Sequence, residues 1–276
     1  MGLNMRSPDS GSFMEARPIR RLGQNFLVDT AARDLIVNSA DLSRSDTVLE
    51  VGPGPGFLTE ALVASAGKVI AVEKDPRFVR ILKRRHAGSR RLRIVEGDVL
   101  ETKLPSFNKI VCSPPYYISS RLVLLLISKR FRRAVLTLQK EFAERLAAKP
   151  GSPDYGRITV MVQHKASVEV AGLIRRDSFR PAPRVDSAVV IIRRKRPDVP
   201  LKSERLFGDT VRFLFTQRRR KAKKVLRRYL ETLLGRGVLT SSDLPSLSDA
   251  RVYELPVSDF ERLSNEIFKM RSQSLA

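Results

Sequence analysis

The sequence predicts an α/β domain with a mainly parallel sheet, followed by a smaller domain made only of helices. Short β-rich runs alternate with helical stretches over most of the chain, an order typical of a parallel sheet covered by helices. A charged, proline-bounded segment at 193–200 then interrupts the pattern, and after residue 203 the apolar side chains recur at helical spacing. A chain of 276 residues is long enough for both parts.

The sheet is expected to hold seven strands. The first five are expected at 47–51, 68–72, 92–95, 109–112 and 134–138, with helices near 57–66, 76–86 and 119–129. Two later β-rich runs, at 167–173 and 187–193, have no helical pattern between them, so we expect them to pair antiparallel at the sheet edge. The domains are therefore expected at 19–195 and 201–276, after a loose N-terminal tail of residues 1–18.

The charge balance indicates a polyanionic partner. There are 52 Lys and Arg residues against 29 Asp and Glu residues, a formal net charge of +23, which favours contact with phosphates. A membrane surface is the alternative, but the longest apolar run, 122–127, is far too short to span a bilayer. Basic clusters occur at 83–85, 90–93, 129–133 and 218–228, the last on an expected helix. Any one of them could be a solvated helix face, whereas together they favour a binding surface spread over both domains.

The low number of cysteine and histidine residues limits the possible chemistry. One cysteine and two histidines exclude a disulfide framework and a Cys/His metal cluster, so we expect a cytoplasmic protein without a structural metal. Cys112 completes an apolar strand and is expected to be a buried structural thiol. His86 and His164 have no partner at ligand spacing and are expected at the surface. A monomer is the default expectation.

A glycine-rich loop, Glu50 to Gly56, lies between the first strand and the first helix. Glycine permits positive φ and close approach of a ligand to the backbone, and the helix that follows adds its dipole. The nicotinamide fingerprint would require a third glycine at 57, where Phe57 stands, so the G-x-G-x-G spacing disfavours a dehydrogenase. Glu73 ends the second strand, where it can accept both hydroxyls of a ribose, and Asp98 follows the third, where it can accept from an adenine amino group. The loop and both acids together predict a cofactor site that fits an adenosine, at the carboxyl edge of the sheet. The glycines by themselves could also form a tight turn that binds no ligand.

The segment Ser113-Pro-Pro-Tyr116 follows the fourth strand. Its two prolines fix an extended loop that exposes the carbonyl of Pro114, and Tyr116 can stack on a flat base. The N6 amine of adenine is a poor nucleophile because its lone pair is delocalised into the ring. Acceptors for both of its N–H bonds, at Ser113 and Pro114, would let the nitrogen become tetrahedral and attack a methyl group, chiefly through positioning and charge stabilisation. A Pro-Pro turn with an aromatic plug is the alternative interpretation.

Four segments in this order resemble the ribosomal RNA adenine N6,N6-dimethyltransferases: 22–27, 50–59, 113–120 and 179–187. The resemblance covers about residues 20–230. It implies a Rossmann-like class I methyltransferase domain that uses S-adenosylmethionine, and a helical C-terminal domain that contacts RNA. It also implies dimethylation of two adjacent adenosines in the 3′-terminal hairpin loop of small-subunit rRNA, linked to ribosome biogenesis.

The resemblance further implies roles for individual residues. For the cofactor these are Asn25 and Leu27 at the methionine end, Gly52 and Gly54 in the loop, Glu73 at the ribose, Asp98 and Val99 at the adenine, and Ser113. For catalysis they are Ser113, Pro114 and Tyr116, with Phe179 stacking on the flipped adenine; a hydrophobic plug is the equal alternative for Phe179. The family usually has Asn where Ser113 stands. We expect this difference to affect the rate of methylation more than the type of reaction. The segment 154–157 also resembles the family and is expected to be a loop without chemistry.

Two other functions remain open from the sequence. One is methylation of large-subunit rRNA, as in the resistance-type relatives, and the other is a ribosome-assembly or RNA-binding factor of the same fold with weak catalysis. The basic segment that starts the second domain favours the small-subunit branch, and the intact glycine loop with both acids disfavours lost catalysis.

Overall fold

The computed structural model describes residues 16–235 and 245–274. The chain divides into two compact units, the first formed by 1–143 and 169–194 and the second by 144–168 and 195–276. The expected N-terminal tail, 1–18, lies mostly outside the described residues. The expected first domain, 19–195, includes residues 144–168, which cluster with the second unit. No helix in the described part of the chain combines the length and apolar character that a membrane span requires.

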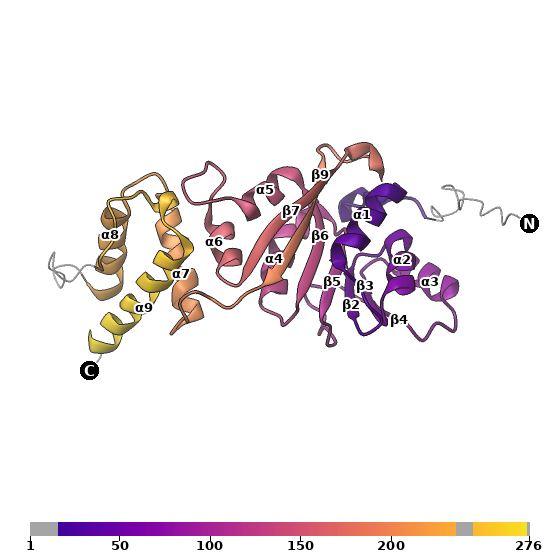
Figure 1. Ribbon diagram of the computed structural model, residues 1–276, viewed down its shortest axis with the longest axis horizontal. Helices are drawn as coiled ribbons and strands as arrows, with labels where there is room; N and C mark the ends of the chain where they lie inside the picture. The colour runs from indigo at the N-terminus through magenta and orange to yellow at the C-terminus, as the bar shows by residue number, and fades with distance from the viewer. Residues whose placement is uncertain (1–15, 236–244, 275–276) are drawn as a thin grey trace, which may run out of the picture. The chain divides into compact units, whose positions relative to one another are not determined.

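The first unit contains the seven-stranded sheet that the sequence predicts, in the order β4-β3-β2-β5-β6-β9-β7 (Figure 1). The strands are β2 (Thr47–Val51), β3 (Lys68–Glu73), β4 (Leu92–Glu96), β5 (Lys109–Cys112), β6 (Arg133–Gln139), β7 (Ala166–Ile174) and β9 (Ser187–Arg194). Strands β2 to β6 run parallel to one another, and β9 runs antiparallel to β6. The linker expected from 193 begins slightly later, because Arg193 still pairs with Arg133 at the end of β9.

Helices connect the parallel strands where the sequence predicts them. They are α2 (Phe57–Ser65), α3 (Pro76–Arg85) and α4 (Ser119–Ile127). The structure adds α1 (Thr30–Ala40) and α5 (Lys140–Ala147), which the sequence analysis missed. Helix α1 packs on β5, β6 and β9 beside α2, and Ile36 on its buried face is fully enclosed. Its first turn is capped by Asp29, which accepts from the Ala32 N–H and from the Ser178 hydroxyl.

A short second sheet lies at the N-terminal end of this unit. Strand β1 (Phe26–Leu27) pairs antiparallel with β8 (Phe179–Arg180), so Leu27 stands opposite Phe179. Phe179 is fully buried in the hydrophobic core that also holds Leu27, Val111 and Val135. The hydrophobic plug is therefore the role that the structure gives Phe179, and stacking of its ring on an open base is not what the structure shows. Cys112 is fully buried as predicted, and burial raises the pKa of its thiol.

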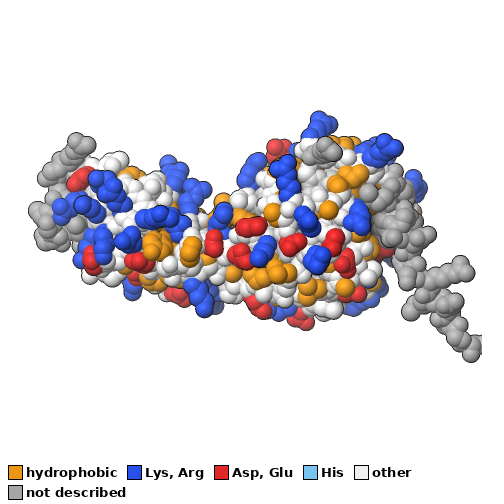
Figure 2. All heavy atoms as spheres, turned by 90° about the horizontal axis from the view of Figure 1, so that it is seen from above, with side chains coloured by type: hydrophobic (Ala, Val, Ile, Leu, Met, Phe, Trp, Pro, Cys, Tyr) orange, Lys and Arg blue, Asp and Glu red, His pale blue; other side chains and the backbone are white. Residues whose placement is uncertain are grey.

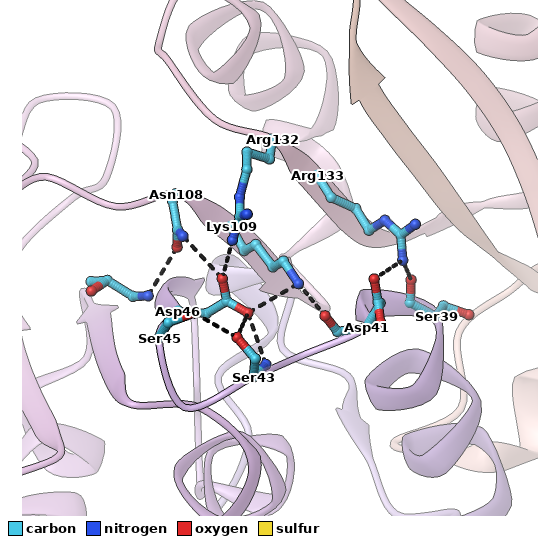
Figure 3. Close-up of polar contacts among 10 residues, drawn as sticks. Ser39, Asp41, Ser43, Ser45, Asp46, Asn108, Lys109, Arg132 and Arg133 are labelled. Atoms are coloured by element: carbon cyan, nitrogen blue, oxygen red, sulfur yellow. Dashed lines mark hydrogen bonds and ion pairs between the residues drawn. The ribbon is translucent and has the colours of Figure 1, made fainter.

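The amino edge of the sheet is closed by a cluster of charges around Asp46, just before β2 (Figure 3). Asp46 is 1% exposed, and Lys109 Nζ lies 3.0 Å from its Oδ2. Arg132 pairs with Oδ1, which also accepts from Asn108 Nδ2 at 2.9 Å. The backbone N–H and hydroxyl of Ser43 donate to Oδ2. Each carboxylate oxygen of Asp46 thus has at least two partners, and these partners come from three segments of the chain.

The second unit is helical apart from its part of β7. Its helices are α6 (Arg157–Gln163), α7 (Glu204–Phe215), α8 (Ala222–Leu234) and α9 (Val257–Ser274). Tyr155, in the segment expected to be a simple loop, is fully buried in the core of this unit, and Arg157 begins α6. The prediction of a surface position for His164 is wrong: the ring is fully buried, with Nδ1 2.6 Å from Glu261 Oε1, and it packs on Phe207. His86 is half-buried.

Candidate active site

A pocket opens where the carboxyl ends of β2, β3 and β5 meet the N-terminal segment of the chain. Four stretches line it: 22–27, 50–58 with its glycine loop, Glu73 with Lys74 at the end of β3, and 113–117 after β5. The structure therefore gathers eight of the predicted site residues in one lining: Asn25, Leu27, Gly52, Gly54, Glu73, Ser113, Pro114 and Tyr116. Parallel strands bring their carboxyl ends to the same edge, which is why segments so far apart in sequence meet here.

The glycine loop has the backbone conformation that only glycine adopts without strain. Gly52, Gly54 and Gly56 have φ values of +66°, +54° and +95°. A Cβ at Gly54 would lie 2.8 Å from Phe26 Cε1, so the loop and the N-terminal segment are in direct contact. The Gly54 N–H donates to Glu73 Oε2 at 2.9 Å, which ties the loop to the end of β3. Helix α2 begins at Phe57, directly after the loop.

Glu73 lies in the pocket with one backbone hydrogen bond on each oxygen. Besides the bond from Gly54, Oε1 accepts from the Asp75 N–H at 2.8 Å. Glu73 is 6% exposed, and this burial raises the pKa of its carboxyl. A carboxylate offers about four lone pairs, so Glu73 retains capacity to accept hydroxyl donors. Asp75 caps α3 and accepts from Gln24 Nε2 at 3.0 Å, which fastens the N-terminal segment over the pocket.

Asp98 and Val99 are not part of the pocket lining. Asp98 pairs with Lys74, which does line the pocket, at 2.9 Å, and its other oxygen accepts from the Leu100 N–H. These hydrogen bonds, the Leu100 N–H first, lower the pKa of Asp98. Val99 is buried.

The tetrapeptide Ser113 to Tyr116 lines the pocket beside the loop. Pro115 stands close to Gly52, whose notional Cβ would lie 3.4 Å from its Cδ. The Tyr116 hydroxyl lies 2.6 Å from Ser187 Oγ, and burial raises the pKa of this phenol. Tyr116 is therefore fixed at its hydroxyl end, while its ring lines the pocket.

Two of the pocket residues to which the sequence gave no role have side chains that could act on a ligand. Glu50, the residue before Val51 at the end of β2, is 1% exposed, and its Oε2 has no hydrogen-bond partner among the described residues. Burial, reinforced by the nearby Glu73, raises the pKa of Glu50 to about 8. The signal for it was present, since a carboxylate inside a buried strand directly before a glycine loop is rarely structural. The second is Tyr117, an exposed aromatic ring at the rim.

The pocket suits a ligand that is cationic and contains a ribose. Two buried carboxyl groups line it, one of them with an unsatisfied oxygen, and its glycine loop leaves no room for side chains. The model of the ribosomal RNA adenine dimethylase family matches residues 17–269. The chain belongs to this family. It is accordingly an rRNA adenine methyltransferase with S-adenosylmethionine as the methyl donor, in a class I methyltransferase fold.

Individual relatives of this dimethylase cover nearly its whole length. A probable ribosomal RNA small subunit methyltransferase A of Thermococcus sibiricus is 40% identical over 270 residues, 94% of each chain. A dimethyladenosine transferase from Plasmodium falciparum has a similar structure, with a TM-score of 0.74, 28% identity and coverage of 90% of this chain and 98% of that one. The 23S rRNA methyltransferase ErmE matches with a TM-score of 0.66 and 28% identity, over 88% of this chain and 100% of its own.

The basic segment of the dimethylase at 218–228 has two structural parts. A helix was expected for residues 218–221, but they form the turn before α8. Arg218 is used internally: its guanidinium donates to the carbonyls of Pro153 and Tyr155 and lies over the ring of Tyr253. Exposed cations lie on α8, at Lys223, Lys224, Arg227 and Arg228, and in the turn before it, at Arg219, Arg220 and Lys221. Figure 2 shows Lys and Arg side chains gathered over one face of the helical unit. In the described residues, no group of His, Cys, Asp and Glu side chains is arranged to hold a metal ion.

Proposed function

We propose that the protein dimethylates the N6 amines of two adjacent adenosines in the 3′-terminal hairpin loop of small-subunit rRNA, as a cytoplasmic monomer acting on the precursor of the small ribosomal subunit. The observation that supports this most is the shared pocket: the glycine loop with Glu73 and the Ser113 to Tyr116 segment line one cavity, so a methyl donor and an adenine amine would meet there. The name of the Thermococcus relative, a small subunit methyltransferase, supports the choice of substrate.

In this proposal each segment of the pocket has one task. S-adenosylmethionine supplies an electrophilic methyl group. Glu73 accepts from its ribose hydroxyls, Gly52 and Gly54 allow close approach, Asn25 and Leu27 cover the methionine end, and Asp98 and Val99 contact the adenine beyond Lys74. Neither Asp98 nor Val99 lines the pocket; Asp98 is connected to it through its ion pair with Lys74.

The target amine is held by acceptors of this chain. Ser113 Oγ and the Pro114 carbonyl accept its two N–H bonds, which removes the lone pair from the ring and aims it at the methyl group. The ring of Tyr116, fixed through Ser187, packs on the adenine. No strong base is needed, because the sulfonium sulfur would keep the electron pair of the broken S–CH3 bond and the proton would leave to solvent only after the nitrogen has become cationic; catalysis is chiefly positioning. The exposed cations of α8 supply sequence-independent contacts to RNA phosphates.

The function is tested with labelled methyl donor, immature small subunits and large-subunit rRNA. We expect label on two adjacent adenosines of the small-subunit RNA, found as N6,N6-dimethyladenosine by digestion and mass spectrometry. Ser113→Ala should lower turnover, and Ser113→Asn, which restores the usual acceptor of the family, should retain or raise it. Label on large-subunit adenine would support the second candidate, which the likeness to ErmE favours. Label on a pyrimidine, or equal rates for all three proteins, would contradict the proposed chemistry.

A further inference from the structure

Tyr117 lies at the rim of the pocket, and the chemistry described above gives it no role. Its side chain is 59% exposed, and among the described residues it is the only exposed large hydrophobic side chain in the pocket lining. The two aromatic residues that the sequence offered for stacking are differently placed. Tyr116 is tied to Ser187 through its hydroxyl, and Phe179 is fully buried in the core. Tyr117 is thus the aromatic side chain of this site that presents a ring to solvent.

The backbone on both sides holds the Tyr117 ring in place. Gly23, with φ of +59°, lies against it: a Cβ at this position would stand 2.9 Å from Tyr117 Cδ1 and 3.4 Å from Cε1. Any side chain at residue 23 would displace the ring. On the other side the Ile118 N–H donates to the Pro115 carbonyl at 3.2 Å, and the Ile118 side chain is buried. The ring therefore lies against Gly23, its backbone is held in the turn after Pro115, and 59% of the residue is exposed.

We propose that Tyr117 is a stacking platform for the base next to the target adenosine, which makes it a positioning residue for the RNA substrate. This inference rests on the proposed function. Exposed aromatic rings bind splayed bases of single-stranded loops by stacking, which needs no particular hydrogen-bonding edge. The target amine is held at Ser113 and Pro114, so a ring one residue beyond Tyr116 at the rim meets the neighbouring nucleotide. Because stacking uses the face of the base and not its amino group, the platform accepts adenine before and after dimethylation, as two adjacent targets require.

The first test uses fluorescence and needs no turnover. The chain contains no tryptophan, so Tyr117→Trp introduces a single indole at the rim. Titration with a hairpin RNA that carries two adjacent adenosines should quench its emission, and the same hairpin with an abasic site beside the target should quench it much less. Leu173→Trp is the matched control, because Leu173 is 60% exposed in the same unit but outside the pocket lining. Equal quenching in both variants, or no effect of the abasic site, would overturn the proposal.

The second test separates RNA binding from chemistry. Tyr117→Ala should raise KM for immature small subunits roughly 5- to 150-fold, the factor of one stacked base, with a smaller change in kcat. Tyr117→Phe keeps the ring and should retain the KM of the unaltered protein. An unchanged KM in Tyr117→Ala, while the unaltered protein methylates the adenosines normally, would refute the platform and leave the proposed function standing. Absence of methylation of immature small subunits by the unaltered protein would instead refute the proposed function, and the fluorescence titration would still decide on stacking.

Discussion

One strand of the sheet has a buried carboxyl group at each end, and the two behave in opposite ways. Asp46 directly precedes β2 and Glu50 lies one residue before its end, and each is 1% exposed. Burial by itself raises the pKa of Asp46, but hydrogen bonds from Lys109, Ser43 and Asn108 outweigh it and hold this pKa well below its usual range. Glu50 has no such partners for Oε2, and burial raises its pKa to about 8.

The comparison shows that burial alone does not decide whether a carboxyl group is charged; its partners do. At the amino edge of the sheet the buried Asp46 stabilises the fold, because both of its carboxylate oxygens accept from donors of the same chain. The carboxyl edge leaves an acid unsatisfied beside the glycine loop, at a cost in stability, and this is where we propose that the methyl donor binds. An unsatisfied buried acid with a raised pKa inside a pocket is one sign of a functional site. Three substitutions test the contrast.

The largest effect is expected from Asp46→Ala. This change leaves the Lys109 ammonium, itself only 6% exposed, without its counter-charge, so the free energy of unfolding should fall by about 3–5 kcal/mol. Urea denaturation at pH 7 measures it. Lys109→Met in the same background should recover part of the loss, because no unpaired charge then remains buried. A loss below about 1 kcal/mol would show that the cluster in Figure 3 is not a stabilising network.

Glu50→Gln should raise the free energy of unfolding, whereas Asp46→Ala should lower it. Between pH 4.5, the ordinary pKa, and about 8, the folded protein holds a proton on Glu50 that the unfolded chain releases. The contribution of Glu50 to stability therefore falls as pH rises through this window. The neutral amide does not titrate, so Glu50→Gln should be more stable than the unaltered, ligand-free protein by about 4 kcal/mol at pH 8 and by about 1 kcal/mol at pH 5. Denaturation at both pH values checks this, and a pH-independent difference would contradict the raised pKa.

The smallest of the three effects is expected from Gly54→Ala. The left-handed φ should cost about 1–2 kcal/mol of stability, and the new methyl group would push against Phe26 at the pocket wall. Gly88→Ala is the matched control, because Gly88 has φ of +79° but no atom within 4 Å of its notional Cβ. Both variants should lose stability, whereas only Gly54→Ala should weaken binding of S-adenosylmethionine in calorimetry. Equal affinities in the two would show that the close contact at Gly54 is irrelevant to the pocket.

Much of the fold could be predicted from the local spacing of apolar residues in the sequence. The seven strands and α2, α3 and α4 were predicted to within about two residues, because alternation and apolar runs need no knowledge of distant partners. Helix α1 was missed although its signals are local: Asp29 is a good N-cap, and Ala32, Ile36 and Ala40 recur at intervals of four residues. The gathering of the glycine loop, Glu73 and the Ser113 to Tyr116 segment was predicted, because all of them follow parallel strands.

The sequence by itself determined the strand and helix order, the glycine loop and the family, since these depend on neighbours along the chain. Only the tertiary structure decided how single side chains are used. It buried His164 against Glu261 and Phe179 in the core, directed Arg218 to the carbonyls of Pro153 and Tyr155, and left Tyr117 open. The physical reason is that exposure, pairing and ionisation depend on the groups that folding brings within a few ångströms, and those partners lie tens of residues away in the sequence.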